Sequence, residues 1–144
     1  MTKTSSVFFL LGTALVGAAY SSVGAQAPTA VNDGIYTAAQ ADRGKAVYAM
    51  NCAACHGDKL EGGASGPELS GPSFTGGYTS GNASALYTKM SQDMPSSAPG
   101  TLMPEQYADV LAYVLSVNKY PAGKTEIPKD GAGLKDVKMA APPK

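Results

Sequence analysis

The clearest hydrophobic pattern in this chain lies between residues 104 and 118. Apolar side chains recur there with the i, i+3, i+4, i+7, i+8 spacing of an amphipathic helix; they are Tyr107, Val110, Leu111, Val114 and Leu115. Pro104 suits the first helical position, where a missing N–H costs nothing. Pro121 and Gly123 follow Asn118 and indicate that the helix ends near that residue.

A second pattern predicts a helix from residue 37 to about residue 53. Thr37 and Gln40 have the spacing of a capping box, in which Thr37 accepts from the amide of Gln40 and the Gln40 side chain reaches back. Gly44 lies in the middle, where Gly costs about 1 kcal/mol relative to Ala. It is either a tolerated defect or, as we favour, a close helix crossing without room for a Cβ. The candidates for the inward face are Val47, Tyr48 and Met50.

A third, shorter helix is predicted over residues 85–92, capped by Asn82 or Ser84, with Leu86 and Met90 on one face. The segment 57–81 before it is rich in Gly, Ser and Pro and is predicted to be a long loop. A polar linker has a similar composition, but three apolar residues are spread through it, so we expect it to wrap an apolar object. They are Leu69, Phe74 and Tyr78. Because no segment alternates like a strand, the predicted fold class is all-α, with three main helices and long loops.

The two ends of the chain differ from the middle in composition. Residues 1–25 combine Lys3, an apolar run over residues 7–19 and small residues up to Ala25, a pattern typical of a cleaved secretory signal peptide. The alternative is an uncleaved anchor, but the apolar run is shorter than the ~20 residues of a spanning helix. We therefore expect bacterial export to the periplasm. Residues 26–36 are predicted to be a loose arm and residues 37–123 the domain. Residues 124–144 are a Lys- and Pro-rich tail that is either disordered or laid along the surface.

Length and charge narrow the possible functions. The 144 residues suggest one domain, and 11 basic residues against 11 acidic ones leave no net charge. Nucleic-acid binding is not indicated, because the chain has no excess of basic residues. A chain this short makes a small core, to which a buried cofactor would add apolar surface.

Candidate chemistry is concentrated in the run Cys52-Ala53-Ala54-Cys55-His56. This C-x-x-C-H spacing is typical of covalent c-type haem attachment. Two thiols at this spacing form thioether bonds on one edge of the macrocycle, and the next residue, His56, becomes the proximal iron ligand. His56 is also the only His in the chain, so no other histidine competes for that role.

Three other interpretations of the cysteine pair are possible. Cys52 and Cys55 could form a disulfide in an exported protein. They could be a thioredoxin-like redox pair, but the βαβ pattern expected around such a pair is missing. They could belong to a zinc site, but two Cys and one His cannot supply the four Cys or His ligands of a structural zinc.

The sixth iron ligand is expected to be a methionine sulfur. Met50 lies just before Cys52 and cannot easily reach the opposite face of a haem, Met139 lies in the tail, and Met90 belongs to an apolar helical face. Two candidates remain, Met94 and Met103, each followed by Pro. Met94 begins a loop that is free to fold over the iron, whereas Met103 immediately precedes a helix that must pack on the first one.

From residue 37 to about residue 123 the chain resembles the small mono-haem cytochromes c with His/Met ligation. The residues that carry the resemblance are Arg43-Gly44-Lys45-x-x-Tyr48, Cys52-Ala53-Ala54-Cys55-His56-Gly57, Gly66-Pro67-x-Leu69-x-Gly71, Met94-Pro95 and Tyr107-Ala108-x-Val110-Leu111-Ala112-Tyr113. Two further runs look more narrowly like cytochromes that serve quinoprotein alcohol dehydrogenases. They are Met94-Pro95-x-x-Ala98-Pro99-Gly100-x-Leu102 and Asn118-x-Tyr120-Pro121-Ala122-Gly123.

The resemblance implies roles for single residues. Met94 matches the family's distal ligand, and the Pro67 carbonyl matches the acceptor for the imidazole N–H of the proximal ligand. Gly44 matches the glycine where the first and last helices cross, with Tyr113 facing it. The chain departs from the family at Tyr78, where many relatives have Trp, and at Met103, where Ser or Thr often caps the last helix.

The function expected from the sequence is electron transfer by a periplasmic one-electron carrier, not an enzyme, with one covalent haem c and its iron. His56 and Met94 would ligate the iron, and Pro67, Leu69 and Tyr78 would line the haem site. The narrower resemblance implies a quinoprotein alcohol dehydrogenase as donor, and we expect a membrane oxidase as acceptor. The alternatives are a haem enzyme or gas sensor with an open sixth position and a thiol oxidoreductase without haem.

Overall fold

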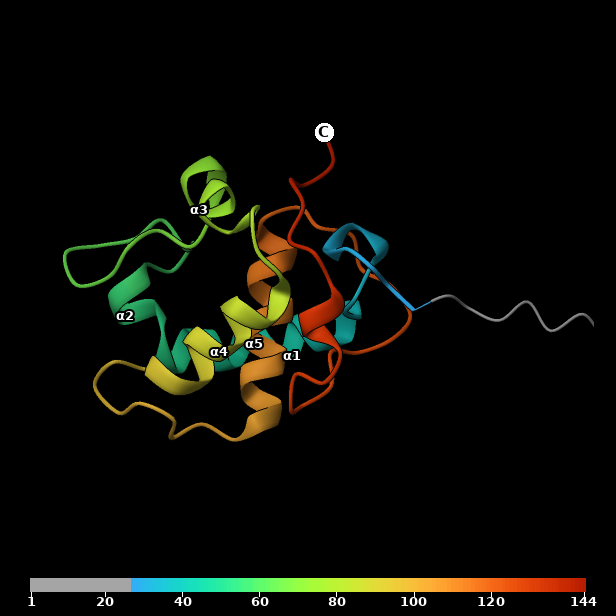
Figure 1. Ribbon diagram of the computed structural model, residues 1–144. Coiled ribbons are helices and arrows are strands. Elements are labelled where there is room, and N and C mark those ends of the chain that lie inside the picture. Colours follow the sequence, from blue (N-terminus) through green and yellow to red (C-terminus); the bar gives the residue numbers. More distant parts are fainter. Residues whose placement is uncertain (1–26) are drawn as a thin grey trace, which may run out of the picture.

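A computed structural model describes residues 27–144 (Figure 1). Its elements are α1 (Ala38–Asn51), α2 (Ala53–His56), α3 (Gly71–Tyr78), α4 (Ala83–Asp93) and α5 (Pro104–Val117), with 3₁₀ turns at Val31–Asp33 and Leu134–Asp136. Over this range only two isolated β-bridges occur, so the predicted all-α class is confirmed. The proposed signal peptide, residues 1–25, lies outside the described residues. No helix within residues 27–144 is long and apolar enough to cross a membrane.

The crossing of α1 and α5 forms the centre of the fold (Figure 1). A Cβ on Gly44 would lie 1.8 Å from the backbone oxygen of Asp109 and 3.0 Å from Cβ of Tyr113. This confirms the close crossing predicted from Gly44. The α5 face predicted from the apolar spacing is buried in full; its residues are Tyr107, Val110, Leu111, Val114 and Leu115.

Only one of the two hydrogen bonds of the predicted capping box forms at the start of α1. Thr37 caps the helix by accepting from the amide of Gln40 at 3.1 Å. The Gln40 side chain does not return to Thr37, because it bonds instead to the backbone of Ile127. Val47 and Tyr48 are buried as expected, but Met50 is 74% exposed, so its assignment to the inward face was wrong.

Two helices lie between residues 57 and 94. The predicted helix capped by Asn82 is α4, and the Asn82 side chain accepts from the amide of Ala85 at 3.3 Å. Helix α3 was missed, because Gly and Pro make up half of its residues and favoured a loop. Burial of Phe74, which is 6% exposed, compensates for that weak helical propensity.

The chain ends are packed rather than loose. Residues 30–36 lie against the helices, with Val31 fully buried. Residues 124–140 also lie against the helices, with Met139 1% exposed, and we call this second segment the C-terminal strap. The two segments are joined by backbone hydrogen bonds from Lys138 to Thr29 and from Val31 to Lys138. The arm was expected to be loose because it shows no period, whereas the tail was expected to be either disordered or laid along the surface. The structure has the second arrangement, which rests on a few buried apolar residues. Those in the strap are Ile127, Leu134, Val137 and Met139.

Candidate functional site

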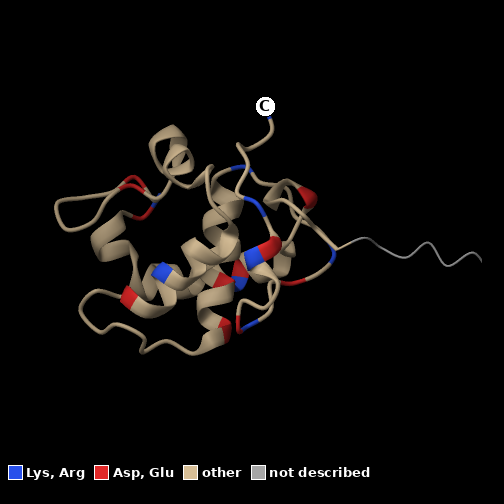
Figure 2. Ribbon diagram, in the orientation of Figure 1, with Lys and Arg blue, Asp and Glu red and all other residues tan. Residues whose placement is uncertain are grey.

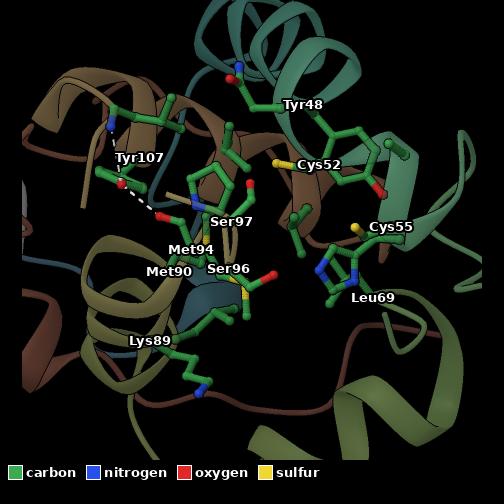
Figure 3. A pocket seen from close by; sticks show the side chains of 18 of the residues that line it. Tyr48, Cys52, Cys55, Leu69, Lys89, Met90, Met94, Ser96, Ser97 and Tyr107 are labelled. Atoms are coloured by element: carbon green, nitrogen blue, oxygen red, sulfur yellow. Dashed lines mark hydrogen bonds between the residues drawn. The ribbon is translucent and has the colours of Figure 1, made fainter. Parts of the chain in front are cut away.

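A cavity of about 440 Å³ opens between the α1–α2 junction, the loop before α3, and helices α4 and α5 (Figure 3). All seven site residues expected from the sequence line it, namely Cys52, Cys55, His56, Pro67, Leu69, Tyr78 and Met94. These residues come from four separate segments of the chain. The fold therefore brings together side chains that are up to 42 positions apart in the sequence.

His56 is the last residue of α2 and is held on two sides. Its ring Nδ1 lies 2.8 Å from the carbonyl oxygen of Pro67, and its backbone amide donates to Cys52 at 2.9 Å. A carbonyl can only accept, so Nδ1 carries the proton and Nε2 keeps its lone pair free for a metal. A Cβ on Gly66 would lie 3.0 Å from Nδ1, so glycine there lets the loop approach the ring.

The two cysteines face the cavity without a disulfide between them. Cys52 joins α1 to α2, and Cys55 lies within the single turn of α2. Burial, with a smaller contribution from Cys55, raises the pKa of the Cys52 thiol to about 11. At neutral pH the Cys52 thiol is therefore neutral, which suits a packed position against apolar surface better than a free redox pair.

Met94 follows α4 directly, and its backbone is fixed at both ends. Its amide donates to the carbonyl of Met90 at 3.1 Å, and its carbonyl accepts from the hydroxyl of Tyr107 at 2.8 Å. Met103 is 55% exposed and is not among the residues that line the cavity. Met90, which we had interpreted as a packing residue, shares the cavity wall with Met94 (Figure 3).

Several cavity residues were not identified from the sequence as part of the site. The apolar ones are Leu86, Val110 and Val114, and the polar ones include Lys89, Ser96, Ser97 and Tyr107. The sequence does not assign Tyr107 to the site, because the residue belongs to the apolar face of α5 and its position is explained by helix packing alone. A hydroxyl on an otherwise aliphatic stripe was the only available signal.

The residues of the cavity fit an iron porphyrin better than a bare metal ion. Among residues 27–144, no group of three or more His, Cys, Asp and Glu side chains could hold a metal ion alone. A porphyrin supplies four nitrogen ligands itself and needs only axial donors such as the imidazole of His56. The largely apolar wall and the two adjacent thiols suit the ring and its vinyl groups.

We compared the chain with known proteins. The crystal structure of the sulfane dehydrogenase SoxCD from Paracoccus pantotrophus is 29% identical, with a TM-score of 0.49, over 60% of this chain. The chain spans 46% of that SoxCD chain, less than half of its length. Among curated proteins there is no significant match.

The family model described as cytochrome c oxidase, cbb3-type, subunit III matches residues 39–114, which is more than half of the chain. That range contains the cysteine pair, His56 and every segment around the cavity. A cytochrome c domain carries covalently bound haem c with its iron and transfers electrons to and from redox partners. The chain therefore belongs to this family of small cytochrome c domains.

Proposed function

We propose that this protein is an exported one-electron carrier that attaches haem c through Cys52 and Cys55 and ligates its iron with His56 and Met94. One observation carries the proposal: both thiols, the imidazole and the Met94 thioether line a single cavity. Figure 3 shows Met90 and Met94 across this cavity from Cys55 and Leu69. The signal-peptide pattern of residues 1–25 supports a periplasmic location.

The residues of the chain tune and shield the site. When bound, haem c supplies a one-electron ferrous/ferric couple. The hydrogen bond to Pro67 holds His56 in one tautomer and makes Nε2 more basic. With Met94 as a second ligand beside His56, the iron would have no position left for a substrate, which favours a carrier over an enzyme or a gas sensor.

The segments around the cavity indicate how partners dock. Residues 46–57, 69–88 and 94–104 contain no Lys, Arg, Asp or Glu. The charged residue that lines the cavity is Lys89, and it is paired with Asp93 at 2.8 Å. In Figure 2 the loop between α4 and α5, and helix α3, are free of charged residues, which gather on other parts of the fold. We infer that redox partners dock on this uncharged rim by apolar contact. The proposed donor, from the narrower sequence resemblance, is a quinoprotein alcohol dehydrogenase, and the proposed acceptor is a membrane oxidase.

Mass spectrometry of the mature protein tests the attachment. We expect one haem added to the polypeptide, retained after acid-acetone extraction, and no free thiol. An intact disulfide between Cys52 and Cys55 without haem mass would contradict the proposal and support the thiol oxidoreductase.

The ligand assignment is tested by Met94→Ala and the matched variant Met103→Ala. Met94→Ala should abolish the ferric sulfur-to-iron charge-transfer band, open the iron to cyanide, and lower the reduction potential. Met103→Ala should keep the band, because Met103 does not line the cavity. If Met94→Ala keeps the band and Met90→Leu removes it, Met90 is the ligand. If wild type lacks the band, the sixth position is open and an enzyme or sensor is favoured.

A further inference from the structure

The loop that carries Met94 is hydrogen-bonded to α5 through one side chain. We call residues 94–102 the Met94 loop. In the described part of the chain, both hydrogen bonds that join this loop to α5 involve the hydroxyl of Tyr107. It donates to the carbonyl of Met94 at 2.8 Å and accepts from the amide of Leu102 at 3.3 Å. The two dashed lines in Figure 3 show this bridge.

Tyr107 joins the two ends of the Met94 loop. Between them, the loop is stabilised by its own short-range bonds, such as the amide of Ala98 donating to Pro95 at 2.8 Å. Residues 96–101 are exposed and uncharged, so neither packing nor ion pairs hold them in place. The loop can therefore move away from the cavity as a unit if its ends are released.

Tyr107 itself is immobilised by the core. It is 4% exposed and lies on the buried face of α5, the helix that crosses α1 at Gly44. Its hydroxyl therefore has a fixed position relative to the helices. The Met94 amide is fixed by α4 and the Met94 carbonyl by Tyr107, so the bond from Cα to Cβ has a defined direction.

We propose that Tyr107 is a positioning residue that keeps the Met94 loop closed over the cavity and so controls whether the thioether of Met94 stays on the iron. The inference rests on the proposed function, because it takes Met94 as the distal ligand. It assigns to this chain a specific determinant of axial-ligand stability and of access for small external ligands. Tyr107 would act without touching the iron, by holding the backbone at both ends of the Met94 loop.

Tyr107→Phe tests the proposal in the haem-loaded protein. Met94 and Leu102 are only partly buried, so water can replace the lost hydroxyl and the variant should fold. External ligands bind the open-loop state, so their apparent affinity rises with its population. Losing two hydrogen bonds should raise the affinity of ferric protein for imidazole about five- to a hundred-fold. The sulfur-to-iron band should also disappear at a lower temperature than in wild type.

Tyr120→Phe is the matched control. Tyr120 is 3% exposed, donates to the carbonyl of Ala140 at 2.8 Å, and is not among the cavity residues. The imidazole affinity of Tyr120→Phe should stay within about two-fold of wild type, because the hydrogen bond lost in this variant lies outside the Met94 loop. The proposal is overturned if Tyr107→Phe binds imidazole with wild-type affinity, or if Tyr107→Phe and Tyr120→Phe show the same increase in imidazole affinity. Absence of the band from wild type would instead overturn the Met94 assignment, so the two failures are distinguishable.

Discussion

The side-chain amide of Gln40 forms a reciprocal pair of hydrogen bonds with the backbone of Ile127. Nε2 of Gln40 donates to the Ile127 carbonyl at 3.0 Å, and the Ile127 amide donates to Oε1 of Gln40 at 2.9 Å. Both residues are buried, with Gln40 2% and Ile127 3% exposed. One side chain of α1 therefore satisfies both backbone polar groups where the C-terminal strap crosses the helix.

Gln40→Leu should be strongly destabilising, although Leu is a good helix former. The substitution leaves a buried N–H and a buried C=O of Ile127 without partners, at about 1–3 kcal/mol for each. We expect the free energy of unfolding in urea to fall by about 2–6 kcal/mol. Gln92→Leu at an exposed position of α4 is the control and should change it by less than about 0.5 kcal/mol. If Gln40→Leu lowers the free energy of unfolding as little as Gln92→Leu does, the contact with the strap contributes little to stability.

Gly44→Ala should prevent the close approach of α1 and α5. The new Cβ would meet the backbone of Asp109, which cannot rotate away as a flexible side chain can. We expect a loss of more than about 3 kcal/mol, or failure to recover folded haem protein. Gly76→Ala in α3 is the matched control, since nothing lies within 4 Å of the added Cβ. That variant should be as stable as wild type or up to about 1 kcal/mol more stable.

Arg43 links the helix crossing to the strap and makes stability depend on pH. It donates to Asp109 at 3.0 and 2.9 Å and to Glu126 at 3.1 and 2.9 Å. The hydrogen bonds from Arg43 hold the pKa of Glu126 below its usual 4.5. A lowered pKa in the folded state adds stability above pH 4.5, which is lost as the pH falls through the folded value.

Glu126→Gln should therefore be less stable than wild type at pH 7, and this deficit should shrink as the pH falls below 4.5. Urea unfolding at pH 7, 5 and 3.5 measures the difference. Glu68→Gln is the control, because Glu68 forms no ion pair or side-chain hydrogen bond in the described part of the chain. A deficit for Glu126→Gln that is the same at all three pH values would show that the pair acts through packing rather than charge.

The sequence predicted features that depend on near neighbours better than those that depend on distant ones. The capping signature of Thr37 and Gln40 is local, and nothing in it reveals a partner 87 residues away. Met50 was misplaced because the buried face of α1 runs through Val47 and Tyr48, and a position two residues further is rotated away by about 200°. Helix α3 was missed because tertiary burial of Phe74 overrides its weak propensity.

The same distinction holds for the site. Cys52, Cys55 and His56 could be proposed at once, because attachment chemistry requires their spacing in the sequence. Met94 could be separated from Met103 only through loop placement and resemblance, and its place on the cavity wall is a property of the fold. The bridge from Tyr107 to Met94 could not be predicted, since periodicity places a residue on a face but says nothing about a hydroxyl's partner.

The uncharged rim predicts that docking depends little on ionic strength. Screening acts on charges that a partner meets, and the three rim segments contain none, while Lys89 at the cavity is already paired with Asp93. With a reduced quinoprotein alcohol dehydrogenase as donor, we expect the second-order rate constant to change less than about three-fold between 10 and 150 mM salt. A steep fall would show that charges outside the rim form the docking patch.

A charge placed on the rim should lower the rate constant of electron transfer, although added salt should not. Ala98 is exposed and lines the cavity mouth, so Ala98→Lys puts a charged group where the partner must exclude water. The rate constant should fall by about ten-fold or more, because burying an unpaired charge costs more than 1.4 kcal/mol. Ala39→Lys, at an exposed position in the first turn of α1 and outside the cavity, should leave the rate within about two-fold. A normal rate for Ala98→Lys would move the docking face away from the Met94 loop, while haem attachment and iron ligation would stand unchanged.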